Sequence, residues 1–435
     1  MLDTMKTPGD TSWFVKDRFG LFIHWGLYSM PARHEWVRNN ERITNEVYDE
    51  KYFKRFEPDL YDPDAWAEAA ANAGMKYFVI TTKHHEGFCL WDSKLTDYKA
   101  PNTPAKRDLL RPMIEAFRKR GIKVGLYHSI IDWHHPQYVI DNKNGPYRES
   151  PDREKMNVGR DQMKYADYLH GQVKELLSEF GKVDILWFDF SFPDKNAPDD
   201  FSKGKGHKAW RSEELMSIIR KLQPHVILDD RLDLPDGWDV KTPEQFQPRA
   251  WVTVNGQPVV WEACQTLSGS WGYHRDESSF RSTENLIQTL IDCVSKGGNL
   301  LLNVGPTARG EIDDRALERL RGIGDWMRRH SRSIYGCTQA PAEFKVPEGC
   351  RLTYNPEKKR LYIHCYVWPY KFLHCEGFAG KVKYAQLLND ASEVNINSVP
   401  EWQQHHMDIP AGTLTLVLPQ VKPNVTVPVI ELYLE

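Results

Sequence analysis

The sequence lacks any strong excess of charge. Its 57 Lys and Arg residues nearly balance 60 Asp and Glu residues, which gives a formal net charge of −3 over 435 residues. A protein that binds nucleic acid or an anionic membrane surface normally carries a clear basic excess. The sequence also lacks a run of 18 apolar residues, so no transmembrane helix is expected. We therefore expect neither nucleic acid nor a membrane among its partners.

Cysteine is scarce and irregularly spaced. The seven cysteines form no CxxC pair, which argues against a disulfide framework or a zinc ribbon. The N-terminal segment, MLDTMKTPGDTSWF, has no apolar core of the kind found in signal peptides. Reduced thiols and the lack of a visible signal peptide together predict a cytoplasmic protein.

A dinucleotide-binding fingerprint is also missing, because no GxGxxG follows the first expected strand. Instead, strand and helix patterns alternate over about 300 residues. The expected strands cover residues 21–25, 75–82, 122–128, 183–189, 226–229, 259–262 and 298–304. The expected helices cover residues 64–73, 108–120, 161–180, 212–222, 284–294 and 314–329. With polar residues at one end of each strand, this pattern predicts an α/β fold with a (β/α)8-like barrel rather than an open doubly wound sheet.

The sequence pattern changes near residue 340. From residue 344 onward, short alternating runs such as RLYIHCYVW and GTLTLVLP are separated by Pro, Gly and Asn. Such runs are typical of a small antiparallel β-sandwich. We expect a catalytic barrel over residues 1–339 and a C-terminal β-sandwich domain over residues 340–435.

The stretch 183–190, VDILWFDF, is the most informative of the expected strands. Its apolar residues suit a buried parallel strand, but it ends at a carboxylate, Asp189, between two phenylalanines. Chemistry in (β/α)8 barrels is placed at the C-terminal ends of the strands. Asp189 is therefore a candidate catalytic carboxylate, with capping of the next loop or pairing with an arginine as the alternative.

Polar residues at or after the other expected strands suggest the chemistry. They are His24, Trp25, Glu35, Trp36, Lys83, His84, His85, Glu86, His128, Asp229, Asp230, Arg231, Glu244, Glu262 and Asn303. Paired carboxylates among histidines and tryptophans suit glycoside hydrolysis, in which one carboxylate attacks the anomeric carbon and a protonated one assists the leaving group. A metal site is the alternative. However, the adjacent His84 and His85 would point to opposite faces of a regular strand, and no HxH or HExxH spacing occurs.

Eight segments carry a resemblance to a known family. They are RFGLFIHWGLYSMP, EW at Glu35–Trp36, KYFVITTKHHEGFCLWDS, VGLYHSIIDW, ILWFDF, TPEQ, WEACQTLSGSWGY and GGNLLLNVGPTARGEI. In these segments the chain resembles the α-L-fucosidases of glycoside hydrolase family 29. TKHHEGFCLW and LLNVGPTARGEI are highly specific, whereas the C-terminal region matches in kind rather than by motif. The resemblance implies no cofactor and no metal.

The resemblance implies two catalytic carboxylates. Such enzymes are retaining, and the nucleophile matches Asp189 in the setting Trp187-Phe188-Asp189. The position of the general acid/base varies in the family, and two residues fit it: Glu244 in TPEQ and Glu262 in WEAC. The resemblance favours Glu244, in a Pro-flanked loop that could reach over the sugar, with Glu262 as a supporting residue.

The resemblance also implies a sugar-binding set. The residues that match those holding the fucose hydroxyl groups are His24, Glu35, Trp36, His84 and His85. His128 stands where some members carry Tyr, and a histidine there can still donate to a hydroxyl group. Arg231 fits an arginine near the nucleophile, where its charge would keep Asp189 ionised.

Phe22 and Trp271 resemble the apolar wall around the C5 methyl group, with ordinary core packing as the alternative for each. Such a wall favours CH3 over CH2OH by about 1–3 kcal/mol. It is what a 6-deoxy sugar requires.

These features predict a retaining exo-α-L-fucosidase that releases terminal α-L-fucosyl residues from glycans through a covalent fucosyl-enzyme. The expected partner is a fucosylated oligosaccharide or glycoconjugate, and the family allows a homo-oligomer. One alternative is an α-L-galactosidase of the same family, since only the C5 pocket separates the two sugars. The other is a catalytically silent fucose-binding protein, which would need neither carboxylate.

Overall fold

A parallel sheet of seven strands forms the larger part of the computed structural model, which describes residues 4–397 and 409–435. The sheet order is β5-β4-β3-β2-β1-β9-β8. The strands are β1 (Phe19–Ile23), β2 (Tyr77–Lys83), β3 (Lys123–Ser129), β4 (Ile185–Asp189), β5 (Ile227–Leu228), β8 (Glu262–Thr266) and β9 (Asn299–Val304). Almost every residue of these strands is buried, as expected for a parallel sheet covered on both faces.

Residues 240–244, here called the closing segment, join the two edges of this sheet. Isolated parallel bridges link the segment to β5 on one side and to β8 on the other: Asp229 with Val240, Lys241 with Trp261, and Glu244 with Cys264. Its backbone donates from Val240 N to Leu228 O at 3.1 Å and accepts at Lys241 O from Glu262 N at 2.9 Å. The closing segment thus takes the place of an eighth strand between β5 and β8 and closes the sheet into a barrel. The predicted (β/α)8-like barrel is confirmed.

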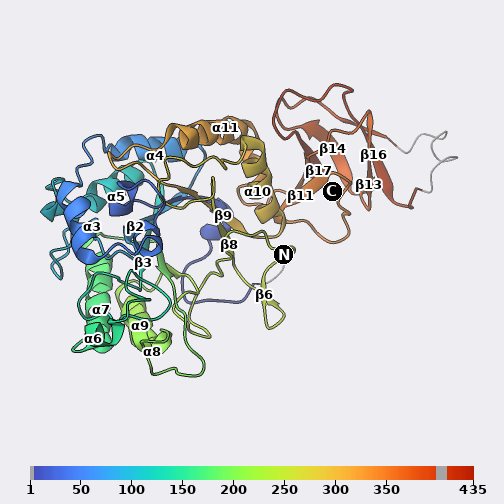
Figure 1. Cartoon of the computed structure of the whole chain (residues 1–435). Helices are drawn as coiled ribbons and strands as arrows, with labels where there is room; N and C mark the ends of the chain where they lie inside the picture. The colour runs from blue at the N-terminus through green and yellow to red at the C-terminus, as the bar shows by residue number, and fades with distance from the viewer. Residues whose placement is uncertain (1–3, 398–408) are drawn as a thin grey trace.

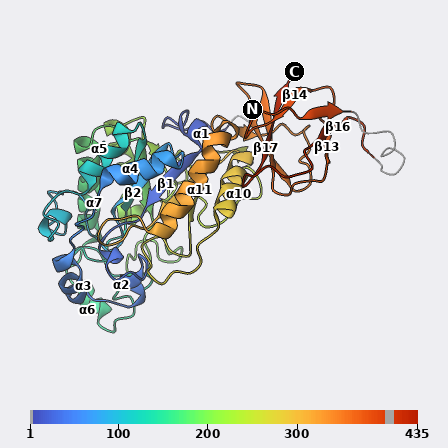
Figure 2. The ribbon, with the colours of Figure 1, turned by 90° about the horizontal axis from the view of Figure 1, so that it is seen from above.

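Helices surround the barrel and alternate with its strands (Figures 1 and 2). The long ones are α4 (Pro63–Asn72), α5 (Leu110–Lys119), α7 (Gln162–Glu179), α9 (Ser212–Leu222), α10 (Thr283–Ser295) and α11 (Asp314–His330). Each lies within about two residues of its expected range. The starts of α4, α7, α10 and α11 carry the side-chain caps that sequence rules look for, such as the Asp62 side chain accepting from Ala65 N at 3.1 Å. In the part of the chain that the structure describes, no helix is both long and apolar enough to cross a membrane.

Shorter elements lie in the loops around the barrel. The α-helices among them are α1 (Phe14–Asp17), α2 (Val37–Asn40), α3 (Asn45–Lys51), α6 (Arg153–Asn157) and α8 (His207–Trp210). The 3-10 helices are η1 (Leu27–Ser29), η2 (Phe53–Arg55), η3 (Ala100–Asn102) and η4 (Ser331–Ser333), and a hairpin joins β6 (Thr253–Val254) to β7 (Gln257–Pro258). Residues 229–239 pass from β5 to the closing segment as a loop, so the barrel is irregular at this point.

Strand β8 corrects an expectation. The apolar run at 259–262 predicts a strand that ends at Glu262, but β8 begins there and continues through the less apolar residues ACQT. All five residues of β8 are buried between the closing segment and β9, so tertiary contacts override the weak strand pattern. Glu262 pairs in register with Asn299, the first residue of β9. It therefore lies at the N-terminal end of the barrel, opposite the rim where Asp189 ends β4.

Two antiparallel sheets form the C-terminal part of the chain, as predicted. One contains β10 (Thr338–Gln339), β11 (Cys350–Asn355), β12 (Arg360–Cys365), β17 (Val429–Leu434) and β14 (Val382–Leu387). The other contains β13 (Phe372–Glu376), β16 (Thr413–Val417) and β15 (Asn395–Asn397). A separate apolar core lies between the two sheets, drawn largely from alternate strand residues. The expected division of the chain at residues 339 and 340 stays a prediction.

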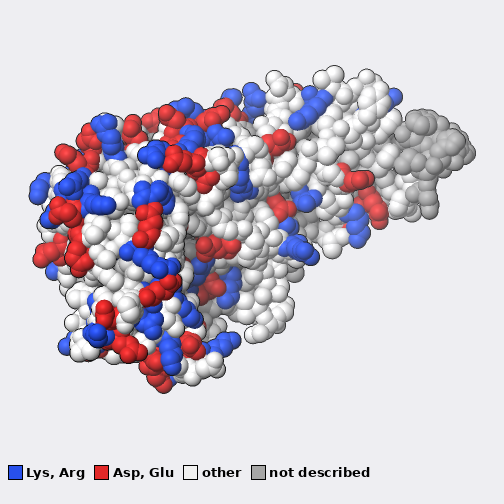
Figure 3. Space-filling view, in the orientation of Figure 1, with Lys and Arg blue, Asp and Glu red and all other residues white. Residues whose placement is uncertain are grey.

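The C-terminal sheets lie at one side of the barrel, next to α10 and α11 (Figure 1). Trp326 on α11 donates from Nε1 to Val427 O at 2.9 Å. Val427 and Val429 belong to the same buried cluster as the barrel core. On the face shown in Figure 3, acidic and basic side chains are interspersed over the barrel, in keeping with the small net charge.

Candidate active site

A narrow cavity lies at the C-terminal ends of the barrel strands. It is lined by Phe22, His24, Trp36, His84, His85, Tyr127, Trp187, Asp189, Phe190, Arg231, Glu244 and Trp271. The structure thus brings together all of the predicted site residues except Glu35, His128 and Glu262. It adds three that the sequence did not single out as lining residues, Tyr127, Trp187 and Phe190.

The centre of the cavity is a pair of carboxylates on one arginine. Arg231 Nη1 donates to Asp189 Oδ1 at 3.1 Å and lies 2.9 Å from Glu244 Oε2. Because both oxygens contact the same nitrogen, they are within about 6 Å of each other, the sum of the two distances. Arg231 also lies over the ring of Trp187, with Cζ 4.7 Å from the ring centroid. A single cation therefore fixes the spacing of two carboxylates.

Asp189 has four close neighbours that set its charge. Besides the contact with Arg231, its Oδ2 accepts from the Tyr127 hydroxyl at 2.9 Å and lies 3.6 Å from His85 Nε2. Burial raises the pKa of Asp189 to about 6; Arg231 and Tyr127 oppose this rise, and Glu244 adds to it. Asp189 is therefore largely ionised at neutral pH and becomes protonated in mild acid.

The protein fixes which nitrogen of His85 carries the hydrogen. Ser129 Oγ donates to Ile131 O at 2.8 Å, so it acts as an acceptor toward His85 Nδ1, which lies 2.7 Å away. Burial lowers the pKa of His85 well below its usual range. The ring is neutral, and Nε2 keeps a lone pair that can accept from a hydroxyl group.

His24 is held in the same way. Asn303 Nδ2 donates to Trp271 O at 2.6 Å, so Asn303 Oδ1 is the acceptor for His24 Nδ1 at 2.6 Å. Burial lowers the pKa of His24 to about 4. His24 Nε2 is therefore a second acceptor on a neutral ring.

Two buried polar atoms of the lining have no hydrogen-bond partner among residues 4–397 and 409–435. They are His84 Nδ1 and Trp187 Nε1. Buried polar groups are normally paired, so these two atoms, on residues that line the cavity, are available to a polar ligand there. Together with His24 and His85, they give the cavity a wall of hydrogen-bonding groups suited to a molecule rich in hydroxyl groups.

The part of the cavity around Phe22 is aromatic rather than hydrogen-bonding. Its ring centroid lies 5.8 Å from that of Trp271 and 5.3 Å from that of Trp187. Phe22 points inward from β1, and Trp271 comes from the loop that follows β8. The cavity therefore combines an aromatic corner with a polar wall, as most small-molecule sites do.

The backbone bends sharply after each carboxylate. Phe190, which follows Asp189, has φ of 84°, and Gln245, which follows Glu244, has φ of 58°. A positive φ is uncommon for residues other than glycine and costs roughly 1–3 kcal/mol for a bulky side chain. The turn at Phe190 places its ring 5.2 Å from Trp36 and 5.3 Å from His85, so the strained residue forms part of the cavity.

His84 and His85 both line the cavity, which differs from the alternation expected of a strand. Strand β2 ends at Lys83, after an irregularity between Thr81 and Lys83. The two histidines follow it in a turn, with ring centroids 4.0 Å apart. Across residues 4–397 and 409–435, no group of three or more His, Cys, Asp or Glu side chains is arranged to hold a metal ion.

Glu35 lies behind the cavity rather than in its lining. Its Oε2 accepts from Gly272 N at 2.8 Å, the residue after Trp271. Burial alone would raise the pKa of Glu35, but the hydrogen bond to His34 and that from Gly272 lower it below its usual value. Glu35 is therefore a charged acceptor that holds the segment carrying Trp271.

His128 corrects a prediction. Tyr127 and His128 are neighbours on β3, so their side chains face opposite sides of the sheet. Tyr127 points into the barrel and reaches Asp189, whereas His128 is fully buried on the outer side, with Nδ1 3.0 Å from Thr82 Oγ1. The tyrosine expected at this place is present one residue earlier. Tyr127 is the register partner of Trp187, and Trp187 faces the same side of β4 as Asp189, two residues later. This register between β3 and β4 identifies Tyr127, not His128, as the residue that faces Asp189.

Glu262 is the third predicted residue outside the cavity. It is buried at the N-terminal end of the barrel, where it accepts a short hydrogen bond from the Tyr77 hydroxyl. Burial raises its pKa to about 8. Its place at the start of β8 removes it from Asp189 and leaves Glu244 as the carboxylate that shares the cavity.

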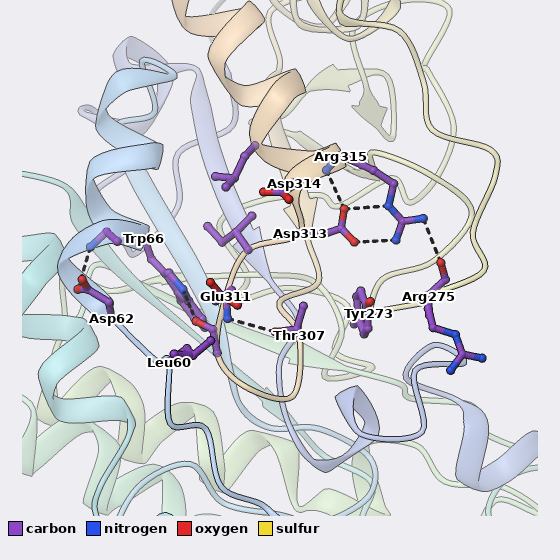
Figure 4. Close-up of a pocket in the computed structure, with 14 residues that line it drawn as sticks. Leu60, Asp62, Trp66, Tyr273, Arg275, Thr307, Glu311, Asp313, Asp314 and Arg315 are labelled. Carbon is purple, nitrogen blue, oxygen red and sulfur yellow. Dashed lines mark hydrogen bonds and ion pairs between the residues drawn. The ribbon is translucent and has the colours of Figure 1, made fainter.

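A larger cavity, of about 700 Å³, lies between the N-terminal ends of α4 and α11 (Figure 4). The narrow cavity measures about 70 Å³. In the larger one, Asp313 is paired with Arg315 at 2.6 Å and Trp66 Nε1 donates to Gly310 O at 2.9 Å, so these groups are engaged within the protein. The narrow cavity is identified as the site by its carboxylate pair, not by its size.

A family model described as alpha-L-fucosidase matches residues 3–332. The chain belongs to the alpha-L-fucosidase family. The predicted membership of glycoside hydrolase family 29 is confirmed, and with it the prediction of a glycosidase.

Known alpha-L-fucosidases are similar to the chain over most of its length. Alpha-L-fucosidase isoenzyme 1 from Paenibacillus thiaminolyticus is 46% identical with a TM-score of 0.90, and 98% of each chain is covered. The tissue alpha-L-fucosidase of Mus musculus is 31% identical over 394 residues, which covers 85% of this chain and 80% of that protein. An alpha-L-fucosidase of family GH29 from Bacteroides thetaiotaomicron, solved as a trapped covalent intermediate with 2-fluoro-fucosyl fluoride, is 26% identical with a TM-score of 0.83, covering 100% of this chain and 98% of that one. The roles assigned above to individual residues stay predictions.

Proposed function

We propose that this alpha-L-fucosidase family member is a retaining exo-α-L-fucosidase that acts on fucosylated oligosaccharides or glycoconjugates. The observation that carries the proposal is the contact of Asp189 and Glu244 with one nitrogen of Arg231. One oxygen of each carboxylate therefore lies within about 6 Å of the other, which is compatible with the separation of about 5–5.5 Å between the carboxyl groups of retaining enzymes. The relative from Bacteroides thetaiotaomicron, trapped as a covalent intermediate, supports the same mechanism.

In the first step, ionised Asp189 attacks the anomeric carbon of the fucosyl group. A bond forms between an Asp189 oxygen and that carbon while the bond from the carbon to the leaving oxygen breaks. Glu244 transfers its proton to the leaving oxygen, which departs as an alcohol. The product is a fucosyl ester on Asp189 and an ionised Glu244.

In the second step, Glu244 acts as a base. It takes a proton from a water molecule, whose oxygen bonds to the anomeric carbon as the ester bond to Asp189 breaks. Fucose leaves with its original anomeric configuration, because two inversions have occurred. Asp189 is again ionised and Glu244 again carries a proton.

The rest of the cavity fits the sugar. His24, His84, His85 and the indole N–H of Trp187 bind its hydroxyl groups, with the two fixed histidines as acceptors. Phe22 and Trp271 pack against the C5 methyl group, which disfavours the CH2OH of an L-galactoside by about 1–3 kcal/mol. The narrow cavity accepts one terminal residue, so the enzyme acts from the end of a chain.

Hydrolysis of 4-nitrophenyl α-L-fucoside, beside the matching α-L-galactoside, tests sugar, activity and nucleophile together. We expect the wild type to prefer the fucoside about 10- to 100-fold in kcat/KM, and Asp189→Ala to lose turnover while it stays folded. Preference for the galactoside would establish the α-L-galactosidase alternative. Binding of fucose without any release of nitrophenol would establish the catalytically silent binding protein.

Glu244→Ala tests the acid/base. A variant without the proton donor should lose more activity on phenyl α-L-fucoside, whose leaving group is poor, than on the activated 4-nitrophenyl fucoside. Azide, which needs no general base, should partly restore its turnover. The matched control is Glu262→Ala, which removes a carboxylate at the other end of the barrel. If Glu262→Ala shows the leaving-group effect and Glu244→Ala does not, the assignment is wrong.

A further inference from the structure

Thr242 lies two residues before Glu244 in the closing segment. Each of its polar atoms forms a hydrogen bond with Asp230 or Arg231, which follow β5. Asp230 Oδ1 accepts from Thr242 N at 3.1 Å and from the Thr242 hydroxyl at 2.8 Å. Arg231 Nε donates to Thr242 Oγ1 at 3.0 Å, and Arg231 Nη2 donates to Thr242 O at 3.1 Å. The hydroxyl thus donates its hydrogen on one side and accepts on the other.

These contacts determine how the guanidinium group of Arg231 is oriented. The group is planar, so fixing Nε and Nη2 on Thr242 fixes the direction of Nη1. Nη1 is the nitrogen that contacts both Asp189 and Glu244. Thr242 therefore sets the point at which the two carboxylates meet the cation.

Asp230 holds Thr242 from the other side. It also pairs with Lys241 Nζ at 3.0 Å, so two successive residues of the closing segment are tied to it. Isolated bridges and a few backbone hydrogen bonds, rather than a continuous ladder, join this segment to its neighbouring strands. The side-chain hydrogen bonds of Asp230 and Arg231 hold the closing segment in place, as the backbone hydrogen bonds of a full strand ladder would do.

We propose that Thr242 is a positioning residue for the reaction, which orients Arg231 between the two carboxylates and holds the segment that carries Glu244. The proposal rests on the function proposed above, with Asp189 as nucleophile and Glu244 as acid/base. Thr242 is 7% exposed and does not line the cavity, so it acts through Arg231 rather than on the sugar.

Three variants test the proposal. Thr242→Val keeps the shape of the side chain but removes both the acceptor for Arg231 Nε and the donor to Asp230. Thr242→Ser keeps the hydroxyl group. Thr253→Val, at an exposed position of the β6–β7 hairpin, is the matched control for the loss of a threonine hydroxyl.

We expect Thr242→Val to lower kcat on phenyl α-L-fucoside at least about tenfold, with a smaller effect on the 4-nitrophenyl substrate and little change in KM. We also expect the acid limb of its pH profile to move upward, because a displaced Arg231 no longer holds Asp189 ionised. The other groups that face Asp189, and that the variant leaves in place, are Tyr127, His85, Glu244 and Asp229. Thr242→Ser should recover most of the loss, and Thr253→Val should match the wild type.

A Thr242→Val enzyme with wild-type kcat and an unmoved acid limb would overturn the proposal. Equal loss in Thr242→Val and Thr242→Ser, with no change in the pH profile, would also overturn it, since only folding would then be affected. The Glu244→Ala test separates this failure from failure of the proposed function. If Glu244→Ala shows the leaving-group effect and Thr242→Val does not, Glu244 is the acid/base and only the role of Thr242 is refuted.

Discussion

Asp189 lies under two opposing influences on its charge. Burial disfavours its charge, and the contacts with Arg231 and Tyr127 favour it. A carboxylate held entirely by strong donors would be a poor nucleophile, and one held by none would stay protonated. The balance gives a pKa near 6, which keeps the group ionised at neutral pH without making it inert.

The same value predicts how the activity depends on pH. In the proposed mechanism only ionised Asp189 attacks, so kcat/KM should fall as the pH drops through about 6 and lose about tenfold for each further unit. Rates on 4-nitrophenyl α-L-fucoside between pH 4.5 and 8 would show this limb. Circular dichroism at each pH provides the control for unfolding. A flat profile from pH 5 to 7 would contradict the assignment of this pKa to the nucleophile.

At the residue scale, the sequence predicted what strand patterns and family motifs encode. Asp189, Glu244 and Arg231 were found because each lies at a rim position or in a matched motif. Tyr127 was missed in favour of His128, because facing direction depends on register, and register is set by the neighbouring strand. The positive φ of Phe190 has no sequence signal at all, since a bulky residue is not expected there.

At the scale of elements, helices were predicted more closely than strands. The apolar period of α9 and the Asp62 cap of α4 belong to the helix itself. Strand β8 depends on its neighbours: its sequence, EACQT, is only weakly strand-like, and burial beside β9 makes it a strand. The closing segment was expected to be a loop for the same reason, and its bridges to β5 and β8 come from tertiary structure.

The burial of Glu262 at the start of β8 predicts how the stability of the fold depends on pH. Glu262 has a pKa of about 8 in the fold against an ordinary 4.5, so the folded state holds a proton that the unfolded chain releases between these values. Stability should therefore fall as the pH rises through that window, by about 3 kcal/mol at pH 7. Glu262→Gln has no proton to retain, and its amide oxygen can still accept from the Tyr77 hydroxyl.

Urea unfolding at pH 4.5 and at pH 7 measures this effect. The Glu262→Gln variant should gain stability relative to the wild type as the pH is raised, with activity unchanged because Glu262 lies away from the cavity. A variant whose stability difference is the same at both pH values would show that Glu262 is already ionised in the fold. Loss of activity at unchanged stability would reopen its role in the chemistry.

At the scale of the molecule, the C-terminal sheets lie beside α10 and α11 and contribute none of the residues that line the narrow cavity (Figure 1). Their contact with the barrel is partly apolar, since Tyr362 and Val429 belong to the barrel core cluster. We infer that this part of the chain stabilises the barrel and does not take part in the chemistry.

Trp326 tests this division of roles. Its indole is 3% exposed, stacks on His330 with centroids 4.9 Å apart, and donates to Val427 O across the contact. Trp326→Ala should lower the free energy of unfolding by about 3–5 kcal/mol while kcat at 25 °C stays near wild type. Trp368→Ala, in the C-terminal part and only half-buried, is the control and should cost less. A large change in kcat at full folding would assign the C-terminal part a role in the reaction.

The shared nitrogen of Arg231 has a consequence for the whole catalytic cycle. In the proposed mechanism, Asp189 is the anion when it attacks the sugar, and the negative charge is on Glu244 once the fucosyl ester has formed. At both stages one anion faces one cation, and both positions of the anion lie within reach of the same nitrogen. The reaction is therefore electroneutral inside the cavity, so no counterion has to enter or leave while the sugar fills it.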